Sequence, residues 1–245
     1  MFPNADATTQ RFDDNFSGSF SGGPRKGVLH TTETEGWPGY NGGASAPHFT
    51  VNGTKVRQHF PISMPSRALR NEDGGVETNR DGAIQIEIVC YSDEVIAEDV
   101  GGIKVRELPT ATLATIAELM RWIEANAGVE RKTLPPARWK RFPASFGKGN
   151  GVRMSNAEWD AFDGWCGHMH VPENVHGDPS VINIDHLMGD IDMPLTDQEI
   201  EKIAIRSAEM VWNRFQLRTG PSGQTLVSLR DALEEIYKDA VEDDT

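Results

Sequence analysis

Hydrophobic and polar positions alternate along the strand-like segments in the first half of the chain. Residues 83–90 (AIQIEIVC) carry three isoleucines at every second position, which is the period of a β-strand. Glu87 is the one charged side chain in this segment, which otherwise has the character of a central strand. Residues 26–30 (KGVLH) form a short apolar run before a polar loop. That run predicts a buried strand whose end delivers His30 to a cleft.

A hairpin and a long helix are predicted on either side of that central strand. Residues 48–51 and 54–60 flank an Asn-Gly dipeptide, the strongest short-range signal for a β-hairpin. After Thr110, apolar residues recur at helical spacing up to Gly128, a residue type that commonly ends helices. Residues 155–165 predict a shorter helix. Strands and helices together predict an α/β domain with a central mixed β-sheet flanked by helices.

The domain organisation follows from where the regular patterns begin and end. Residues 1–25 are rich in Gly, Ser, Asn and Asp without lasting periodicity, so they predict an irregular N-terminal arm, with the core starting after it. A capping box formed by Thr196 and Glu199 opens a later helical pattern. We therefore predict one domain over residues 1–192 and a helical C-terminal region over residues 193–245. The apolar face of that region is a candidate surface for self-association.

The charge balance narrows the range of partners. The 245 residues include 37 Asp and Glu against 24 Lys and Arg, a net charge of −13, and a field of that sign disfavours nucleic acids and anionic membranes. No apolar run approaches the roughly 20 residues of a membrane-spanning helix. The N-terminus lacks the basic start and apolar core of a signal peptide. The composition is that of an ordinary soluble globular protein.

Three of the seven histidines lie in one short loop, residues 167–179 (GHMHVPENVHGDP). The candidate metal ligands of this loop are His168, His170, His176 and Asp178. Zinc takes imidazole and carboxylate ligands in a tetrahedral shell. Two ligands from the loop and His30 from a distant strand would fill three of the four positions. Taken alone, the loop is also typical of a polar turn, since histidines near prolines and glycines often only cap turns.

Four segments, in order along the chain, carry a family resemblance. They are GVLHTTE with His30, SAPHFTV with His48 and Phe49, the IQIEI strand with Glu87, and a late Gly-His pair followed after nine residues by Asp-Pro. In this combination, residues 24–188 resemble the zinc-dependent N-acetylmuramoyl-L-alanine amidases related to peptidoglycan recognition proteins, and among them the phage endolysins. The combination is far more specific than any one motif.

The resemblance implies a role for five residues. His30, His168 and Asp178 match the ligands of one zinc ion, and Glu87 matches the residue that handles the proton. His176 stands where the family commonly has a Lys or Thr that aids catalysis. The implied reaction is hydrolysis of the amide bond between N-acetylmuramic acid and L-alanine of the stem peptide by a zinc-activated water. The first domain would then be the catalytic one.

The chain departs from the family pattern at several positions. Ser180 replaces the glycine that follows Asp-Pro, which implies mild strain if that position needs a positive φ. Pro47 stands where some members have a tyrosine, so no tyrosine role carries over. Family members differ by two residues in the late loop, which leaves His170 as an alternative ligand. We favour His168 because Gly167 precedes it.

The function predicted from the resemblance is that of a peptidoglycan hydrolase that lyses a bacterial host as a phage endolysin. Such a protein binds peptidoglycan, accumulates in the host cytoplasm without a signal peptide, and reaches the cell wall when a separate pore opens. Two alternative functions would use the same cleft. A peptidoglycan-binding module would bind without catalysis, and a zinc peptidase would cut within the stem peptide.

Overall fold

The computed structural model describes residues 1–3, 11–12, 18–23 and 25–189. The predicted helical region over residues 193–245 and its boundary near residue 192 lie outside the described residues. They stay predictions, as does self-association through that region. Among the helices that are described, none is long and apolar enough to cross a membrane.

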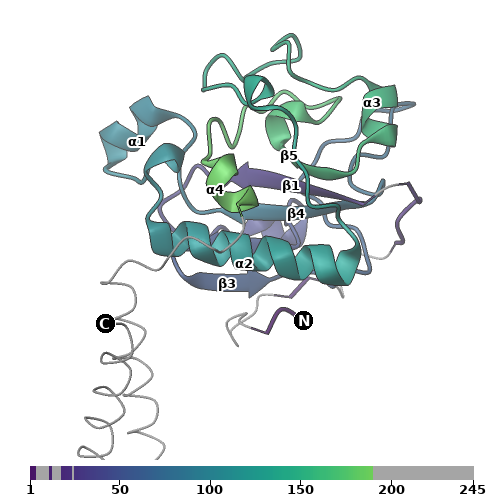
Figure 1. Cartoon of the computed structure of the whole chain (residues 1–245), viewed down its shortest axis with the longest axis horizontal. Coiled ribbons are helices and arrows are strands. Elements are labelled where there is room, and N and C mark those ends of the chain that lie inside the picture. The colour runs from purple at the N-terminus through teal and green to yellow at the C-terminus, as the bar shows by residue number, and fades with distance from the viewer. Residues whose placement is uncertain (4–10, 13–17, 24, 190–245) are drawn as a thin grey trace, which may run out of the picture. The chain divides into compact units, whose positions relative to one another are not determined.

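The fold is built on a five-stranded β-sheet with the strand order β3-β2-β4-β1-β5 (Figure 1). The strands are β1 (Lys26–Thr31), β2 (Phe49–Asn52), β3 (Lys55–Gln58), β4 (Ala83–Ile88) and β5 (Gly164–Gly167). Parallel pairs join β1 to β4, β1 to β5 and β2 to β4, whereas the β2-β3 hairpin is antiparallel. The helices are α1 (Glu94–Val100), α2 (Thr110–Ala127), α3 (Asn156–Ala161) and α4 (Ile184–Met188), with short 3-10 turns η2 (Tyr40–Gly43), η3 (Val105–Glu107), η4 (Pro136–Arg138) and η5 (His168–His170). The predicted mixed sheet flanked by helices is confirmed, and β4, which carries Glu87, is its central strand.

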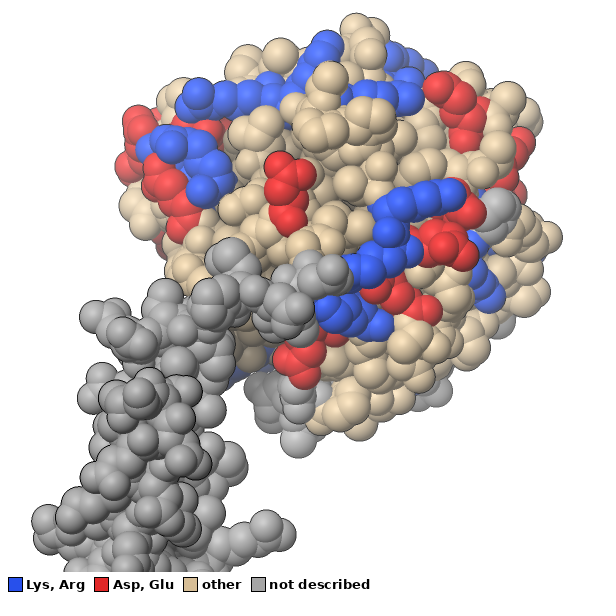
Figure 2. All heavy atoms as spheres, in the orientation of Figure 1, with Lys and Arg blue, Asp and Glu red and all other residues tan. Residues whose placement is uncertain are grey.

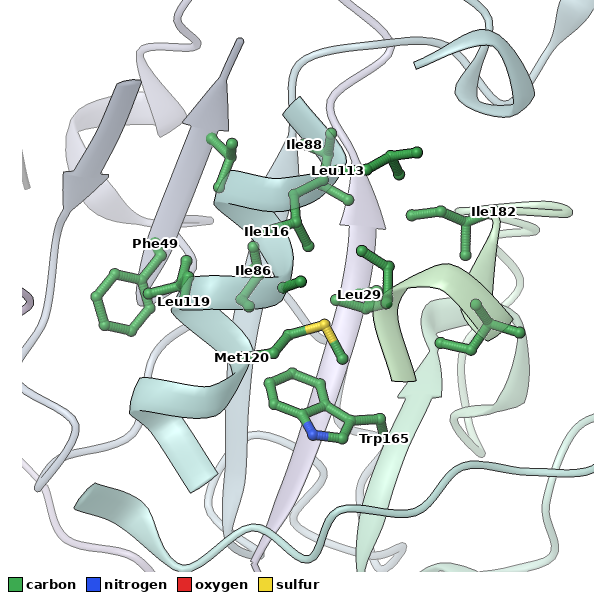
Figure 3. Packing of buried hydrophobic residues seen from close by; sticks show 14 of the residues in the cluster. Leu29, Phe49, Ile86, Ile88, Leu113, Ile116, Leu119, Met120, Trp165 and Ile182 are labelled. Carbon is green, nitrogen blue, oxygen red and sulfur yellow. The ribbon is translucent and has the colours of Figure 1, made fainter. Parts of the chain in front are cut away.

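The main hydrophobic core lies between α2 and one face of the sheet (Figure 3). The residues that pack together there include Leu113, Ile116, Leu119 and Met120 of α2 and Leu29, Phe49, Ile86, Ile88 and Trp165 of the strands. The helix ends at Gly128, as predicted, with a φ of 76° that glycine adopts without strain. Successive strand residues point to opposite faces of a sheet. His30 and Glu87, which follow Leu29 and Ile86, therefore point away from α2.

The opposite face of the sheet carries a smaller apolar cluster. It includes Val28 of β1, Cys166 of β5 and Trp159 of α3. The sequence starts α3 at this place because the side chain of Ser155 and that of Glu158 form a capping box. Beyond this cluster, toward the carboxyl ends of the parallel strands, the face becomes polar. The candidate site residues lie there, at the edge of the sheet where ligands of α/β folds commonly bind.

The described residues of the N-terminal arm contain no helix or strand, but they belong to the core. Phe2 is buried against Trp122 of α2, with ring centroids 5.6 Å apart, and its N–H donates to Gln58. Phe12 is buried beside Phe60. The expectation that the core starts after the arm is therefore wrong. Burial of each phenylalanine side chain stabilises the fold by about 1.5 to 3 kcal/mol. The sequence pattern does not reveal this burial, because the residues around each phenylalanine are mostly polar.

The predicted helix over residues 155–165 is confirmed only in its first part. It ends at Ala161 and the chain then enters β5. Gly164 has a φ of 105°, and a Cβ there would lie 2.5 Å from the carbonyl oxygen of Lys132, so only glycine fits this entry. Trp165 is then fully buried in the core on the α2 side of the sheet. Burial of this indole favours a strand over continuation of the helix.

Charged side chains of both signs lie next to one another on the face that carries α2 (Figure 2). Glu124 of α2, for example, accepts hydrogen bonds from Arg131 and from the indole N–H of Trp165. Elsewhere, Glu94 of α1 forms an ion pair with Arg141. The negative net charge of the chain is therefore not a continuous acidic surface on this side.

Candidate metal centre

His30 lies near the carboxyl end of β1, on the face of the sheet opposite α2. Its side chain is 1% exposed. In the parallel pairing of β1 with β4, His30 is level with Glu87, and Glu87 is level with Thr50 of β2. The sheet thus holds an imidazole and a carboxyl group side by side. His30 lies near the end of the first strand, as the sequence predicts.

The late loop brings His168 and Asp178 together because the chain approaches itself closely at Gly167. A Cβ at Gly167 would lie 2.5 Å from Cδ of Pro179, a distance that real side chains do not tolerate. Glycine therefore lets the two ends of the loop touch. The N–H of Met169 donates to the carbonyl oxygen of Asp178 at 2.8 Å. These contacts hold the two candidate ligands beside the end of β1.

His30, His168 and Asp178 form a buried group with the spacing of a metal site. Nδ1 of His30 lies 3.1 Å from Nδ1 of His168 and 3.5 Å from Oδ2 of Asp178. Nδ1 of His168 lies 3.2 Å from Oδ1 of Asp178. Ligand atoms bound tetrahedrally to zinc at about 2.0 to 2.1 Å are separated by roughly 3.3 Å. The three separations fit a single ion, so this group can bind a metal.

Asn174 fixes which ring nitrogen of His168 is available to a metal. Its Nδ2 donates to the carbonyl oxygens of Arg70 and Pro172, at 3.0 and 2.8 Å, so its Oδ1 is the acceptor. That oxygen lies 2.9 Å from Nε2 of His168, which must carry the hydrogen. The lone pair of the neutral ring then lies on Nδ1, the atom that faces the rest of the group. Nε2 of His30, in contrast, has no hydrogen-bond partner within the described part of the chain.

His170, the alternative ligand, uses both of its ring nitrogens elsewhere. Nδ1 accepts a hydrogen bond from the N–H of Gly167 at 2.8 Å, and Nε2 donates to the carbonyl oxygen of Arg138 at 2.9 Å. The ring packs edge-on against Trp139. His170 therefore has no lone pair left for a metal, whereas His168 has one.

Burial and mutual contact set the charge states of the group. Burial and the neighbouring His168 lower the pKa of His30 to about 4, although Asp178 opposes the shift. Burial alone would raise the pKa of Asp178, but His168 and His30 hold it well below its usual range. The group thus combines a neutral imidazole with an ionised carboxylate at pH 7. These are the protonation states in which histidine and aspartate bind metals.

Glu87 places a carboxyl group next to the candidate metal ligands. Its Oε2 is buried and has no hydrogen-bond partner among the described residues. Burial, together with the negative charges of Asp178 and Glu33, raises the pKa of Glu87 well above its ordinary value. The side chain lines the cavity at the metal centre. A carboxyl group that binds its proton tightly and faces a cavity has the properties of a general acid or base.

A cavity of about 700 Å³ opens at the group, and His176 lies at its exposed edge. The ring of His176 stacks on that of His168, with centroids 4.9 Å apart. Its Nδ1 lies 3.9 Å from Asp178, and its side chain is 67% exposed. Phe142 and Phe146 line the same cavity and pack edge to face. His176 is therefore outside the buried group but within reach of a ligand.

No family model matches this chain, and no curated protein matches it either. Solved structures with a similar chain path include the Staphylococcus aureus hydrolase AmiA in complex with its ligand, with 15% sequence identity and a TM-score of 0.45 over 75% of this chain and 80% of that chain. A mutant endolysin from Bacillus subtilis shares 18% identity, with a TM-score of 0.32 over 52% of this chain and 75% of its own. The catalytic domain of XlyA also shares 18%, with a TM-score of 0.31 over 51% and 75%. The activity of this chain is therefore argued from the chemistry of the site and not from these likenesses.

Ser180, where the resemblance implies a glycine, has a φ of 61°. That value costs a serine more than a glycine. The Oγ of Ser180, however, accepts a hydrogen bond from the N–H of Phe142 at 2.9 Å, which glycine cannot do. This bond offsets part of the strain and ties the end of the loop that carries His168 and Asp178 to Phe142, which lines the cavity.

Asn174 and Arg70 also line this cavity, and the sequence did not predict either of them. An asparagine beside proline and glutamate looks like an ordinary turn residue. The one signal for Asn174 is its place inside GHMHVPENVHGDP, between two histidines. Arg70 lies in a polar loop with no motif around it.

Proposed function

We propose that this chain is a zinc-dependent peptidoglycan hydrolase that cleaves the amide bond between N-acetylmuramic acid and L-alanine. The observation that carries the proposal is the buried group of His30, His168 and Asp178 beside Glu87 at one cavity. Two imidazoles and one carboxylate leave the fourth position of a tetrahedral ion open, as in catalytic rather than structural zinc sites. Zinc in such a site supplies Lewis acidity and lowers the pKa of a water molecule toward about 7.

Glu87 is the proposed proton carrier. Its Oε2 has no competing hydrogen bond among the described residues, so it is available to take the proton of the attacking water. Its raised pKa lets the carboxyl group keep that proton until the amide bond breaks. The proton then passes to the departing nitrogen, so the peptide leaves as an amine. The other product is the lactyl carboxylate of muramic acid.

His176 is the proposed partner of the carbonyl oxygen. Negative charge develops on this oxygen as water adds to the amide carbon, and a positioned N–H donor stabilises it. Stacking on His168 holds the imidazole of His176 at the edge of the cavity. Its exposure leaves the ring accessible to substrate.

The proposal extends to lysis of a bacterial host by a phage endolysin, which the family resemblance supports. A chain of this kind that stays inside the bacterium would reach the cell wall once the membrane is permeabilised. Expression of the full chain in bacteria, followed by a membrane-permeabilising agent, tests this point. Rapid lysis after the agent is expected, and intact walls would contradict the lytic role.

Mass analysis of peptidoglycan digested by the zinc-loaded full chain tests the bond that is cut. Muramic acid with a free lactyl carboxylate, released together with intact stem peptides, supports the amidase. Shortened stem peptides would instead indicate a zinc peptidase. Binding to the wall without any product would indicate a non-catalytic binding module.

The role of Glu87 is tested by Glu87→Gln, with Glu98→Gln as a control at an exposed position of α1. Glu87→Gln is expected to keep its zinc and to lose about 10²- to 10⁴-fold in turnover. The control is expected to retain both. A fully active, zinc-loaded Glu87→Gln variant would remove Glu87 from the reaction.

A further inference from the structure

Arg70 is the one lysine or arginine among the described residues that line the cavity at the metal centre. The carboxylate side chains of that lining are Glu33, Glu87, Asp93 and Asp178. Arg70 is exposed, and its guanidinium forms no hydrogen bond or ion pair with any residue in the described part of the chain. Arg70 thus brings a permanent positive charge to the lining of this cavity, and that charge also helps to lower the pKa of the nearby Glu72.

The backbone that carries Arg70 is fixed by side chains from other parts of the chain. The N–H of Arg70 donates to Oδ1 of Asn174 at 2.9 Å, and its carbonyl oxygen accepts from Nδ2 of the same amide at 3.0 Å. The N–H of Leu69 donates to Asn79 at 3.0 Å, and the Leu69 side chain is buried. Asn174 is also the residue that holds the ring of His168. One amide therefore positions both Arg70 and a metal-binding histidine.

Other cationic side chains around the site have structural partners. Arg141 pairs with Glu94 of α1, and Arg153 donates to backbone carbonyl groups of the metal-binding loop. Lys148 donates to Glu72 at 2.6 Å and lowers the pKa of Glu72 more than Arg70 does. Arg70 differs from these residues because its backbone is held rigidly while its guanidinium is left for a ligand.

We infer that Arg70 binds a carboxylate of the substrate and thereby selects its chemical form. A guanidinium matches a carboxylate with two parallel hydrogen bonds. The inference rests on the proposed function, in which the substrate is a muramoyl peptide. The second stem residue of such peptides is linked through its side chain, so its α-carboxyl group is either free or amidated. Arg70 favours the free acid, because an amide has no charge and offers only one acceptor oxygen.

The test compares two soluble substrates on the zinc-loaded full chain. They are N-acetylmuramoyl-L-alanyl-D-glutamate, with its side-chain carboxyl group blocked as a methylamide, and the α-amide of the same blocked compound. The wild type is expected to prefer the free acid by about 10- to 100-fold in kcat/KM, mainly through KM. In Arg70→Gln this preference is expected to disappear while turnover of the amide stays within about twofold. Arg70→Lys keeps the charge without the planar fork, so an intermediate preference is expected.

Arg67→Gln is the matched control, because Arg67 is also exposed but lines a different cavity. It is expected to behave as the wild type. Binding of both dipeptides to the zinc-free full chain, measured by calorimetry, gives a second readout that needs no turnover. Arg70→Gln is expected to weaken binding of the free acid by the same factor as it changes KM.

Equal preference in the wild type and in Arg70→Gln, by turnover and by binding, would overturn the role of Arg70. The amidase proposal would survive that result if both dipeptides are cleaved. If neither dipeptide is cleaved but the free acid still binds in an Arg70-dependent way, the amidase proposal fails and the carboxylate site stands.

Discussion

Replacing Asn174 with alanine should weaken zinc binding through the ring of His168. The amide accepts the Nε2 hydrogen of His168 and the N–H of Arg70, and it donates to the carbonyl oxygens of Arg70 and Pro172. Without the amide, the hydrogen of the histidine ring is no longer held on Nε2. The ring can then present a protonated Nδ1 to the metal-binding group.

The hydrogen bonds of Asn174 set the size of the expected loss in stability and of the expected loss in zinc affinity. Three groups lose the partner that Asn174 supplies, since the Arg70 carbonyl oxygen keeps a bond from Thr78. The His168 and Pro172 groups are buried, whereas the N–H of Arg70 is partly buried. Each buried unsatisfied group costs about 1 to 3 kcal/mol, so the free energy of unfolding is expected to fall by about 2 kcal/mol or more. Loss of the polar partner of a metal-binding histidine typically weakens metal affinity by about 10- to 100-fold.

The chain offers a matched control in Asn150. This buried amide also makes four hydrogen bonds, to the N–H groups of Val152 and Arg153 and to the carbonyl oxygens of Ser145 and Met169. It contacts no ring of the metal-binding group. Asn150→Ala is therefore expected to lose stability comparably while keeping its zinc affinity. Urea unfolding of the zinc-free proteins and zinc competition with a chromophoric chelator measure the two quantities separately.

Asn174→Asp provides a variant that separates folding from metal binding. An aspartate keeps the acceptor for His168 but turns a carboxylate oxygen toward the carbonyl oxygens of Arg70 and Pro172. Stability is expected to fall while zinc affinity stays at or above that of the wild type. If Asn174→Ala binds zinc as tightly as Asn150→Ala, the proposed orientation of the His168 ring by Asn174 is refuted.

His168→Ala is expected to bind no zinc, whereas the folded fraction of His170→Ala should keep it; equal zinc content in metal analysis would reverse the ligand assignment. In the zinc-free chain, the raised pKa of Glu87 means that the folded state binds this proton more tightly than the unfolded state does. The resulting stability is full below the ordinary pKa of 4.5 and is lost as pH rises toward the raised pKa. In urea unfolding, the free energy of unfolding of Glu87→Gln relative to the wild type should therefore rise with pH, by up to about 1.4 kcal/mol per pH unit. Parallel curves of unfolding free energy against pH for the two proteins would contradict the direction of the shift. Chelation of zinc should lower the thermal midpoint, because a site saturated a thousandfold above its Kd stabilises the fold by about 4 kcal/mol; an unchanged midpoint would argue against a metal held by the folded chain.

Much of the sheet could be predicted because its strands carry their own pattern. Alternation in residues 83–90 and the Asn-Gly dipeptide are local signals, and the structure confirms a strand over Ala83–Ile88 and a hairpin. The turn of the hairpin is shifted by one residue to Gly53 and Thr54, because Asn52 pairs with Lys55. β5 could not be predicted, since its four residues include two glycines and show no period. It becomes a strand because it pairs with β1 and because Trp165 is buried in the core with α2. The short helices α1 and α4 were missed because so few turns show little periodicity.

The candidate site likewise contains residues that the sequence could predict and residues that it could not. His30, Glu87, His168 and Asp178 have the residue types that metal chemistry requires, so motif order alone could name them, and the structure places them together. Their roles as ligands and proton carrier stay predictions. The role of Asn174 could not be predicted, because it depends on the backbone groups that its side chain contacts only after folding. The same holds for the fixed backbone of Arg70.

His30 and His168 are 138 positions apart in the sequence, which has a consequence for synthesis of the chain. The ribosome releases β1 early, but its neighbour β5 and the loop that follows emerge only after almost the whole described domain has been made. A pairing this distant in sequence forms late, after the intervening chain has closed. The nascent polypeptide therefore does not yet hold the three candidate ligands together, and under the proposed function zinc binds only after this domain has been made. Under the proposed function, a cell that produces this chain is exposed to hydrolytic activity only from molecules in which this domain has been completed.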